Sequence, residues 1–355
     1  MNSLLSDFNK LFTPALRDFF SLKRQELTKY PPIVREVGDQ IASLTLSGGK
    51  RIRPALLYYS YQGFSQKKKH TGSVRIQNYC LAIEILHTWA LIHDDIMDQS
   101  ILRRGKATTY KYFQNKYNPR LGLNLSILAG DLALSWADEL FYSASPSRSP
   151  RLSGRQAFGH LEGVTKLFSQ MKNEVITGQI MDIFTVKTAK EALQMMELKT
   201  AQYSVEKPLL IGALLAGAND SELHTLSNLG LKIGIAYQLQ DDLLGVFGVP
   251  KTLGKDITSD MKEGKMNLLI IKTLSQLQSI DRKKFLSLWG SPKAGLDDLK
   301  EVQKIIKLSS GLNSFNKYYN SLTKDINANL KNKNITNILQ KSLEELINFN
   351  IIRQT

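Results

Sequence analysis

The sequence has 355 residues, with 47 lysines and arginines against 32 aspartates and glutamates, which gives a formal net charge of +15. With 42% hydrophobic and 22% charged residues, its composition is that of a folded globular protein rather than a disordered one. It contains no run of 18 or more apolar residues, so we expect no stable membrane insertion. The single cysteine, Cys80, excludes an internal disulfide framework and a cysteine-built zinc site, and we expect a cytoplasmic protein.

The positive charge does not predict a nucleic-acid partner. Basic residues are spread along the chain, with small clusters at 67–69 and 282–284, and aromatic residues do not interleave with a basic stripe. We expect a solvated basic surface, with some lysines and arginines reserved for anionic ligands.

The first twenty residues predict an amphipathic helix rather than a secretory signal. Its apolar residues recur at helical spacing: Leu4, Leu5, Phe8, Leu11, Phe12, Leu16, Phe19 and Phe20. Asp7, Lys10 and Arg17 interrupt the continuous apolar segment that a signal peptide needs. We expect the helix to pack on the protein body. An interfacial membrane helix is the alternative, which Pro14 and Asp18 disfavour.

Helical periodicity dominates the rest of the chain, so the fold class is predicted to be all-α. Apolar residues follow three- and four-residue steps around 73–97, 121–143, 155–186, 190–216, 220–247, 264–278, 297–307 and 334–352. The sequence lacks period-two alternation and Asn-Gly or Asp-Gly hairpin signals. Its Gly- and Pro-containing connections are too short to be interdomain linkers. We therefore expect one helical domain over 1–355, with a motif-bearing core at about 40–275 and C-terminal helices at 276–355.

The strongest chemical signal is the segment LIHDDIMDQSILRRG at 91–105. Asp94 and Asp98 are four residues apart, so on a helix their carboxylates stand one turn apart on one face, with Asp95 beside them. Oxygen ligands without histidine or cysteine favour magnesium over zinc. The guanidinium groups of Arg103 and Arg104 are suited to phosphate oxygens. Alone, such a segment also fits a solvated helix end beside a surface arginine pair.

A second acidic pair ends another apolar helical segment, GIAYQLQDDLLG at 234–245. Asp241 and Asp242 close this segment much as Asp94 and Asp95 close the first. Two long helices that each end in adjacent aspartates can face carboxylates across one cavity. Such a cavity would hold several magnesium ions and clamp a diphosphate.

These motifs, with several others in matching order and spacing, resemble the trans-isoprenyl diphosphate synthase (polyprenyl synthetase) family. The segments that carry the resemblance are GGKRIRPAL at 48–56, HTWALIHDDIMDQSILRRG at 87–105, AGDLAL at 129–134, GQIMDI at 178–183, KTAQYS at 199–204, YQLQDDLLGVFG at 237–248 and GKDITSDMKEGKMNLLI at 254–270. The resemblance implies an isoprenoid-synthase-type bundle around a central cavity, Mg²⁺-dependent prenyl transfer and a homodimer. One departure is Gly245, which stands where many members have a third aspartate.

The family pattern also implies a role for individual residues. The implied contacts to the diphosphate of isopentenyl diphosphate are Lys50, Arg53, His87 and Arg104. Those to the allylic diphosphate are Arg103, Lys199, Thr200, Gln238 and Lys255. The implied magnesium ligands are Asp94, Asp95, Asp98, Asp241 and Asp242. Of all these, we expect six to act in catalysis: Asp94, Asp98, Arg103, Lys199, Asp241 and Lys255.

The expected product is geranylgeranyl diphosphate. Trp89 and Ala90 precede Asp94 by five and four residues, so they lie over the next helical turn from the metals. In the family, a bulky residue here looks like a floor that stops chain elongation. One aromatic beside a small residue resembles the geranylgeranyl synthases, with a farnesyl diphosphate synthase as the alternative. Trp89 could instead simply pack against a neighbouring helix.

Three other classes are alternatives at this stage. A class I terpene cyclase has no need for GGKRIR at 48–53 or for the paired Arg103 and Arg104. A magnesium phosphohydrolase would need a base that positions water and no second diphosphate pocket. A non-catalytic synthase subunit would be expected to lose some of the acidic residues.

Overall fold

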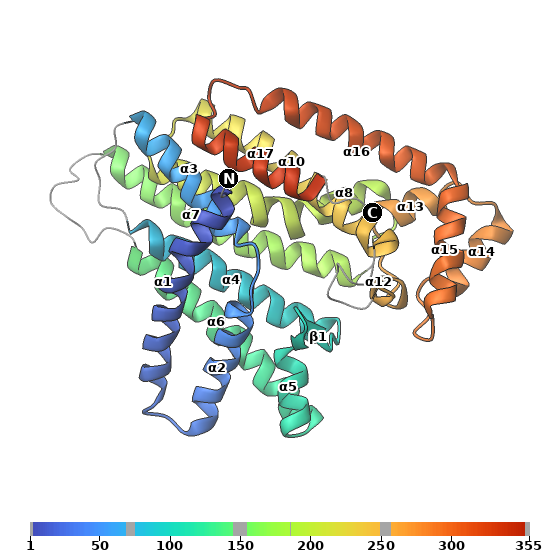
Figure 1. Ribbon diagram of the computed structural model, residues 1–355, viewed down its shortest axis with the longest axis horizontal. Coiled ribbons are helices and arrows are strands. Elements are labelled where there is room, and N and C mark those ends of the chain that lie inside the picture. Colours follow the sequence, from blue (N-terminus) through green and yellow to red (C-terminus); the bar gives the residue numbers. More distant parts are fainter. Residues whose placement is uncertain (1–2, 69–74, 145–154, 185, 249–256, 352–355) are drawn as a thin grey trace.

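The computed structural model describes residues 3–68, 75–144, 155–184, 186–248 and 257–351 as a bundle of helices with one small β-ribbon (Figure 1). The helices before the ribbon are α1 (Leu4–Leu27), α2 (Pro32–Leu46), α3 (Ile52–Lys68) and α4 (Ile76–Met97). The ribbon pairs β1 (Leu102–Arg103) with β2 (Lys106–Ala107). The helices that follow are α5 (Thr109–Lys116), α6 (Pro119–Ala144), α7 (Arg155–Ile183), α8 (Ala189–Met196), η1 (Glu197–Glu206), α9 (Lys207–Leu215), α10 (Asp220–Phe247), α12 (Ser259–Lys262), α13 (Leu268–Leu274), α14 (Ser279–Leu288), α15 (Leu296–Leu308), α16 (Ser310–Asn329) and α17 (Asn337–Ile351). The all-α prediction is confirmed, and none of the described helices is both long and apolar enough to cross a bilayer.

The N-terminal helix α1 packs on the protein body, as expected. Its Ser3 side chain accepts a hydrogen bond from the backbone N–H of Ser6 at 3.2 Å, which caps the helix start. The rings of Phe19 and Phe20 lie edge-on to Trp136 of α6, with centroids 6.1 and 6.3 Å away. The inclusion of Leu11 in the apolar face is wrong, because this residue lies at the edge of the stripe and is 67% exposed.

Two long helices, α4 and α10, carry the two acidic motifs at their C-terminal ends. Helix α4 packs closely against α6 because the buried side of α6 consists largely of small residues: Ser126, Ala129, Gly130, Ala133 and Ala137. Helix α10 begins with a capping box formed by Asn219 and Glu222. In Figure 1 both helices run from the left of the view toward α12. Their acidic ends therefore lie at the same end of the bundle.

The segment expected as one helix over 190–216 is three elements, α8, η1 and α9. Element η1 is a π-helix, in which backbone hydrogen bonds span five residues instead of four. Glycines on both sides let its backbone lie unusually close to its neighbours. A Cβ added at Gly178 of α7 would lie 2.4 Å from the backbone nitrogen of Lys199. One added at Gly234 of α10 would lie 2.4 Å from the Cα of Ala201. The π-helix is thus held between two helices by close backbone contacts.

The β-ribbon is an element that the sequence patterns do not predict. Arg104 and Gly105 form its two-residue turn, and both have positive φ angles, 53° and 75°. Such angles at both central residues are those of a type I′ hairpin turn, which usually contains Asn-Gly or Asp-Gly. Here the Arg104 guanidinium donates to the Leu44 and Gly48 carbonyls, which helps to hold the unusual backbone.

The C-terminal third of the chain covers the outer side of α10. Helix α16 lies along α10 and α13, and α17 packs against α3 and α10 (Figure 1). The segment expected at 264–278 is shorter, as α13, because Asn267 caps its start and accepts from the N–H of Ile270 at 3.1 Å. The sequence patterns do not predict α14 and α16 as separate helices, although they predict C-terminal helices at 276–355.

We predict that Gly234→Ala lowers the free energy of unfolding by about 1–3 kcal/mol, because the new methyl group must push η1 away from α10. Denaturant unfolding followed by circular dichroism measures the change. Gly295→Ala is the matched control, since its Cβ would meet only Asp298 at 3.9 Å. Equal stability of the two variants would contradict the close packing of η1.

Candidate active site

A cavity of about 370 Å³ lies between α7, η1, α10, α12 and the start of α13. Its charged lining residues are Lys50, Asp182, Lys199, Asp241, Asp242, Asp260 and Lys265. Its uncharged polar lining residues are Thr200, Tyr237, Gln238 and Asn267. Residues from six separate segments of the sequence thus converge on one polar cavity. The second acidic motif lines it, whereas Asp94, Asp95 and Asp98 of the first motif are not among its lining residues. Asp94 and Asp98 contact the cavity only through Lys199 and Lys265.

The carboxylates of Asp94 and Asp98 on α4 are paired with cations from distant segments. Asp94 lies 3.2 Å from Arg103 Nη2 and 3.4 Å from Lys199 Nζ. Burial would raise the pKa of Asp94, but the charges of Lys199 and Arg103 outweigh it and hold the pKa below its ordinary value. Asp98 lies 3.4 Å from Lys265 Nζ, yet burial and the neighbouring Asp94 raise its pKa to about 6. Cations therefore lie beside both carboxylates, but only at Asp94 do they outweigh burial.

Asp95 shares Arg103 with Asp94 but is more deeply buried. Its side chain is completely buried and accepts a hydrogen bond from Arg103 Nε at 2.7 Å. Burial raises its pKa to about 6. Its second oxygen, Oδ2, is buried without a hydrogen-bond partner. Asp95 therefore anchors Arg103 in the structure as it stands.

The second acidic motif lines the cavity and belongs to a hydrogen-bond chain. Thr200 Oγ1 donates to Gln238 Oε1 at 2.7 Å, and Gln238 Nε2 donates to Asp242 Oδ1 at 2.8 Å. Burial raises the pKa of Asp242 well above its ordinary value, and the nearby Asp260 and Asp241 add to this effect. Asp242 Oδ2 is buried without a partner. An unpartnered buried oxygen among several carboxylates fits a bound cation.

In the described parts of the chain, no three acidic, histidine or cysteine side chains converge closely enough to form a complete metal site. This is compatible with Mg²⁺, which commonly keeps several waters and uses one or two carboxylates together with substrate phosphates. The donor set is therefore suited to Mg²⁺ that arrives with a diphosphate.

Sequence reasoning missed three charged residues of the cavity: Asp182, Asp260 and Lys265. Asp182 on α7 lies 2.5 Å from Lys199 Nζ. Lys265 Nζ lies 3.8 Å from Asp260 and 2.9 Å from Glu263, in addition to its contact with Asp98. All three missed residues belong to segments that carry the family resemblance, 178–183 and 254–270, so that resemblance was the available signal.

Asp260 also explains why the second motif has a glycine in place of a third aspartate. A Cβ at Gly245 would lie 2.3 Å from Asp260 Oδ2. The carboxylate of Asp260 occupies the space that a side chain at position 245 would need. A third acidic group is therefore present beside Asp241 and Asp242, but it comes from α12.

The β-ribbon separates two adjacent arginines. Arg103 contacts Asp94 and Asp95, whereas Arg104 donates to the Leu44 and Gly48 carbonyls on the other side. Successive residues of a strand point to opposite faces, and the positive φ of Arg104 turns the chain at this point. Neighbours in sequence thus serve two different regions of the site.

The second region is a cluster of cations around His87. Arg53 Nη2 donates to Ser204 Oγ at 2.7 Å, and the guanidinium lies 4.5 Å from the centroid of the Tyr203 ring. His87 Nδ1 lies 2.5 Å from the Tyr203 hydroxyl. Burial, followed by the charges of Arg53 and Arg104, holds the pKa of His87 well below its ordinary value, so the ring is neutral at pH 7. Arg53 Nε is buried without an acceptor, which makes it a ready donor to an anion.

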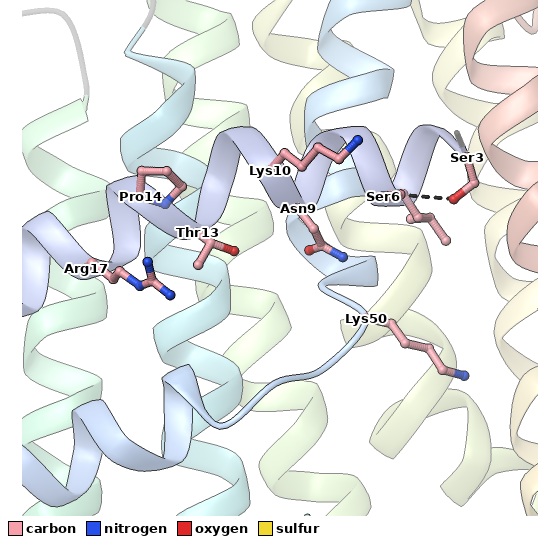
Figure 2. Close-up of a pocket in the computed structure, with 9 residues that line it drawn as sticks. Ser3, Ser6, Asn9, Lys10, Thr13, Pro14, Arg17 and Lys50 are labelled. Atoms are coloured by element: carbon pink, nitrogen blue, oxygen red, sulfur yellow. Dashed lines mark hydrogen bonds between the residues drawn. The ribbon is translucent and has the colours of Figure 1, made fainter. Parts of the chain in front are cut away.

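Lys50 lies on the connection between α2 and α3 and borders two hollows. One is the acidic cavity, and the other is a larger, open hollow of about 630 Å³ along α1 (Figure 2). The α1 residues that line the open hollow include Asn9, Thr13 and Arg17. Figure 2 shows the Lys50 side chain pointing away from α1. The orientation of Lys50 therefore favours the acidic cavity.

The remaining predicted site residues are Lys255, Trp89 and Ala90. Lys255 lies outside the described residues. Trp89 is buried and its ring lies edge-on to His93, with centroids 5.9 Å apart. Among the described lining residues of the acidic cavity, neither Trp89 nor Ala90 appears. Packing of Trp89 inside the bundle is thus observed, while its role in product length stays a prediction.

The sequence and the structure resemble those of known isoprenyl diphosphate synthases. The polyprenyl synthetase family model matches residues 34–306. The chain is 36% identical to a geranylgeranyl diphosphate synthase of Sulfolobus acidocaldarius, over 88% of this chain and 89% of the relative. It is 32% identical to a (2E,6E)-farnesyl diphosphate synthase of Mycobacterium bovis, over 74% and 68% of the two chains. The crystal structure of a geranylgeranyl pyrophosphate synthase from Corynebacterium glutamicum, complexed with isoprenyl diphosphate and magnesium, superposes with a TM-score of 0.89 at 27% identity, covering 99% of both chains.

We predict that Gly245→Ala weakens Mg²⁺-dependent binding of inorganic pyrophosphate by about tenfold or more, because the new methyl group displaces the Asp260 carboxylate. Isothermal titration calorimetry measures the affinity. Asp260→Ala should weaken binding to a similar degree, and the double variant should be no worse than either single one, since both act on one carboxylate. Unchanged affinity in Gly245→Ala would contradict the role given to Asp260.

Proposed function

The chain belongs to the polyprenyl synthetase family and is an isoprenyl diphosphate synthase, and we propose that it is a Mg²⁺-dependent geranylgeranyl diphosphate synthase. It would condense isopentenyl diphosphate with allylic diphosphates to a short all-trans product. The observation that carries the proposal is the pairing of one acidic cavity with a neighbouring cationic cluster, since two diphosphates need two sites. Lys50 is assigned to the cluster by the family pattern, and it also borders the acidic cavity. Farnesyl diphosphate synthase is the alternative, because a relative of that activity is 32% identical.

Isopentenyl diphosphate is assigned to the cationic cluster. Its diphosphate would accept hydrogen bonds from Lys50, Arg53, Arg104 and His87. The unpartnered Arg53 Nε supports this assignment, since a buried donor without an acceptor is costly unless a ligand supplies one. The neutral His87 ring can donate one N–H without adding charge.

The allylic diphosphate is assigned to the acidic cavity together with Mg²⁺. Asp94, Asp98 and Asp241 would hold the metal from the two helices, with Asp95 and Asp242 as the second residue of each motif. Bound Mg²⁺ would neutralise the charge that develops on the departing diphosphate. Arg103, Lys199 and Lys265, which contact these carboxylates in the structure, would bind oxygens of the same diphosphate. Lys255 is assigned to this diphosphate by family resemblance alone.

The reaction would proceed by ionisation, condensation and elimination. The allylic C–O bond breaks, its electron pair leaves with the diphosphate, and Arg103 and Lys199 stabilise the charge that forms. The double bond of isopentenyl diphosphate then attacks the allylic cation. The backbone carbonyl of Lys199, the hydroxyl of Thr200 and the amide of Gln238 would face this cation. Released diphosphate can accept the final proton, so no protein base is required.

Two further assignments concern assembly and location. We assign a homodimer formed through bundle helices. In support of this, two helices carry apolar side chains that are more than a third exposed: Leu121, Leu123, Ile127 and Leu128 on α6, and Ile176, Ile180 and Ile183 on α7. We also assign the enzyme to the reducing cytoplasm, in keeping with one cysteine, Cys80, that is buried and free.

We predict that the protein releases pyrophosphate from allylic diphosphates only when isopentenyl diphosphate is added, and that the main product after dephosphorylation is geranylgeraniol. Chromatography of products from allylic primers of increasing length measures this. Asp94→Ala should lower turnover by several orders of magnitude without unfolding the protein. Release of pyrophosphate from an allylic diphosphate alone would instead indicate a cyclase or a hydrolase. A wild-type protein that is folded but does not turn over these substrates would indicate a non-catalytic subunit.

We predict that Trp89→Ala shifts the products beyond twenty carbons, because removing a buried indole deepens the space beneath the first acidic motif. The same chromatography measures the shift. Trp136→Ala is the matched control, because it removes the same side chain at a position where the indole packs against Phe19 and Phe20 of α1. An unchanged product distribution in Trp89→Ala would remove the main support for the assigned product length.

A further inference from the structure

The connection between α2 and α3 has a backbone conformation that its own residues do not favour. Three of the four residues at 48–51 have positive φ angles: 108° at Gly48, 120° at Gly49 and 51° at Arg51. The glycines adopt such angles readily, but a residue with a Cβ such as Arg51 does so at a cost. A conformation of this kind persists only where surrounding contacts determine it.

Arg51 makes such contacts from the inner side of this connection. Its side chain is buried and forms an ion pair with Glu84 of α4, which is also buried. Arg51 Nη1 donates to Glu84 Oε1, and Nη2 donates to the backbone carbonyl of Thr45 near the end of α2. The Thr45 hydroxyl lies 2.9 Å from the hydroxyl of Thr88 on α4. One guanidinium thus links α2, the connection and α4.

Arg104 also holds the connection. Its guanidinium donates to the Gly48 carbonyl and packs so closely that a Cβ at Gly49 would lie 2.9 Å from its Nη2. Two arginines therefore clamp the connection to the end of α2, Arg51 through the Thr45 carbonyl and Arg104 through the Leu44 and Gly48 carbonyls. Only Arg51 is tied to a carboxylate by these contacts, so its charge is compensated inside the protein.

The clamp has direct consequences for the cationic cluster. Lys50 and Arg53 flank Arg51 in sequence, and Glu84 precedes His87 by three residues on the same helix. The ion pair therefore fixes the position of Lys50 and Arg53 relative to His87. We propose that Arg51, through its buried ion pair with Glu84, is a positioning residue that sets the geometry of the pocket for the isopentenyl diphosphate group. This inference rests on the substrate assignment made under the proposed function.

The decisive variant is Arg51→Gly, because glycine accepts the positive φ angle while the whole side chain, with its guanidinium, is removed. It should raise KM for isopentenyl diphosphate about tenfold or more, while KM for the allylic diphosphate and kcat change by less than about threefold. Arg51→Lys keeps the charge but cannot reach both Glu84 and Thr45 with a planar fork, so it should restore only part of the affinity. Steady-state kinetics with each substrate varied in turn measures these values.

Lys23→Met is the matched control for a purely structural effect. Lys23 is a buried cation that pairs with Glu26 at 2.9 Å and Glu139 at 2.7 Å, between α1 and α6. Its loss should lower the melting temperature without changing the ratio of the two KM values. If Arg51→Gly behaved in the same way, the positioning role would be overturned.

A further variant keeps the inference testable if Arg51→Gly does not fold. Glu84→Gln preserves the shape of the partner but removes its charge, and it should raise the same KM by a smaller factor. An unchanged KM ratio in Glu84→Gln would then overturn the inference. If the wild-type enzyme is active and its variants keep the ratio of the two KM values, only the positioning role is refuted. A wild-type protein that does not consume isopentenyl diphosphate refutes both the substrate assignment and this inference.

Discussion

Lysines shared between carboxylates of different helices hold the acidic cavity together. Lys199 joins Asp94 of α4 to Asp182 of α7, and Lys265 joins Asp98 of α4 to Asp260 of α12. Without these cations, several half-buried acids at the ends of two helices would repel one another and oppose the packing of the bundle. The same lysines face the region where a magnesium-bound diphosphate is expected. The charges that stabilise the cavity are thus also suited to catalysis.

The surrounding fold separates the residues of the two proposed diphosphate sites, although these residues are close in sequence. The type I′ turn of the β-ribbon directs Arg103 to the acids and Arg104 to the connection after α2. On α4, His87 and Asp94 are seven residues apart, which is about two turns or roughly 10 Å. One helix can therefore contact both substrates while the ribbon separates their cations. Holding both reactants on a rigid helix lowers the entropic cost of bringing them together.

Helical periodicity predicted the fold class because packed amphipathic helices leave a strong local pattern. The acidic motifs and their arginines could also be predicted from the sequence, because binding of magnesium and diphosphate needs fixed residue types at fixed spacing. The π-helix η1 was not visible, because it depends on close contacts at Gly178 and Gly234, which lie outside its own segment. The β-ribbon was missed because Arg104 adopts a glycine-like backbone only through tertiary hydrogen bonds. The same limit concealed how Asp260 fills the space beside Gly245.

The unpartnered buried polar atoms of the site include acceptors on Asp95 and Asp242 and a donor on Arg53. Asp242 Oδ2 is a buried acceptor without a donor, and Arg53 Nε is a buried donor without an acceptor. Each lowers the stability of the unliganded protein, because its lost hydration is not replaced. Metal and diphosphate together supply the missing partners, a cation for the carboxylate and phosphate oxygens for the guanidinium. Ligands that bind only the folded state shift the folding equilibrium toward it. On the proposed assignments, these unpartnered atoms would destabilise the free enzyme, and binding of both substrates would restore the lost stability.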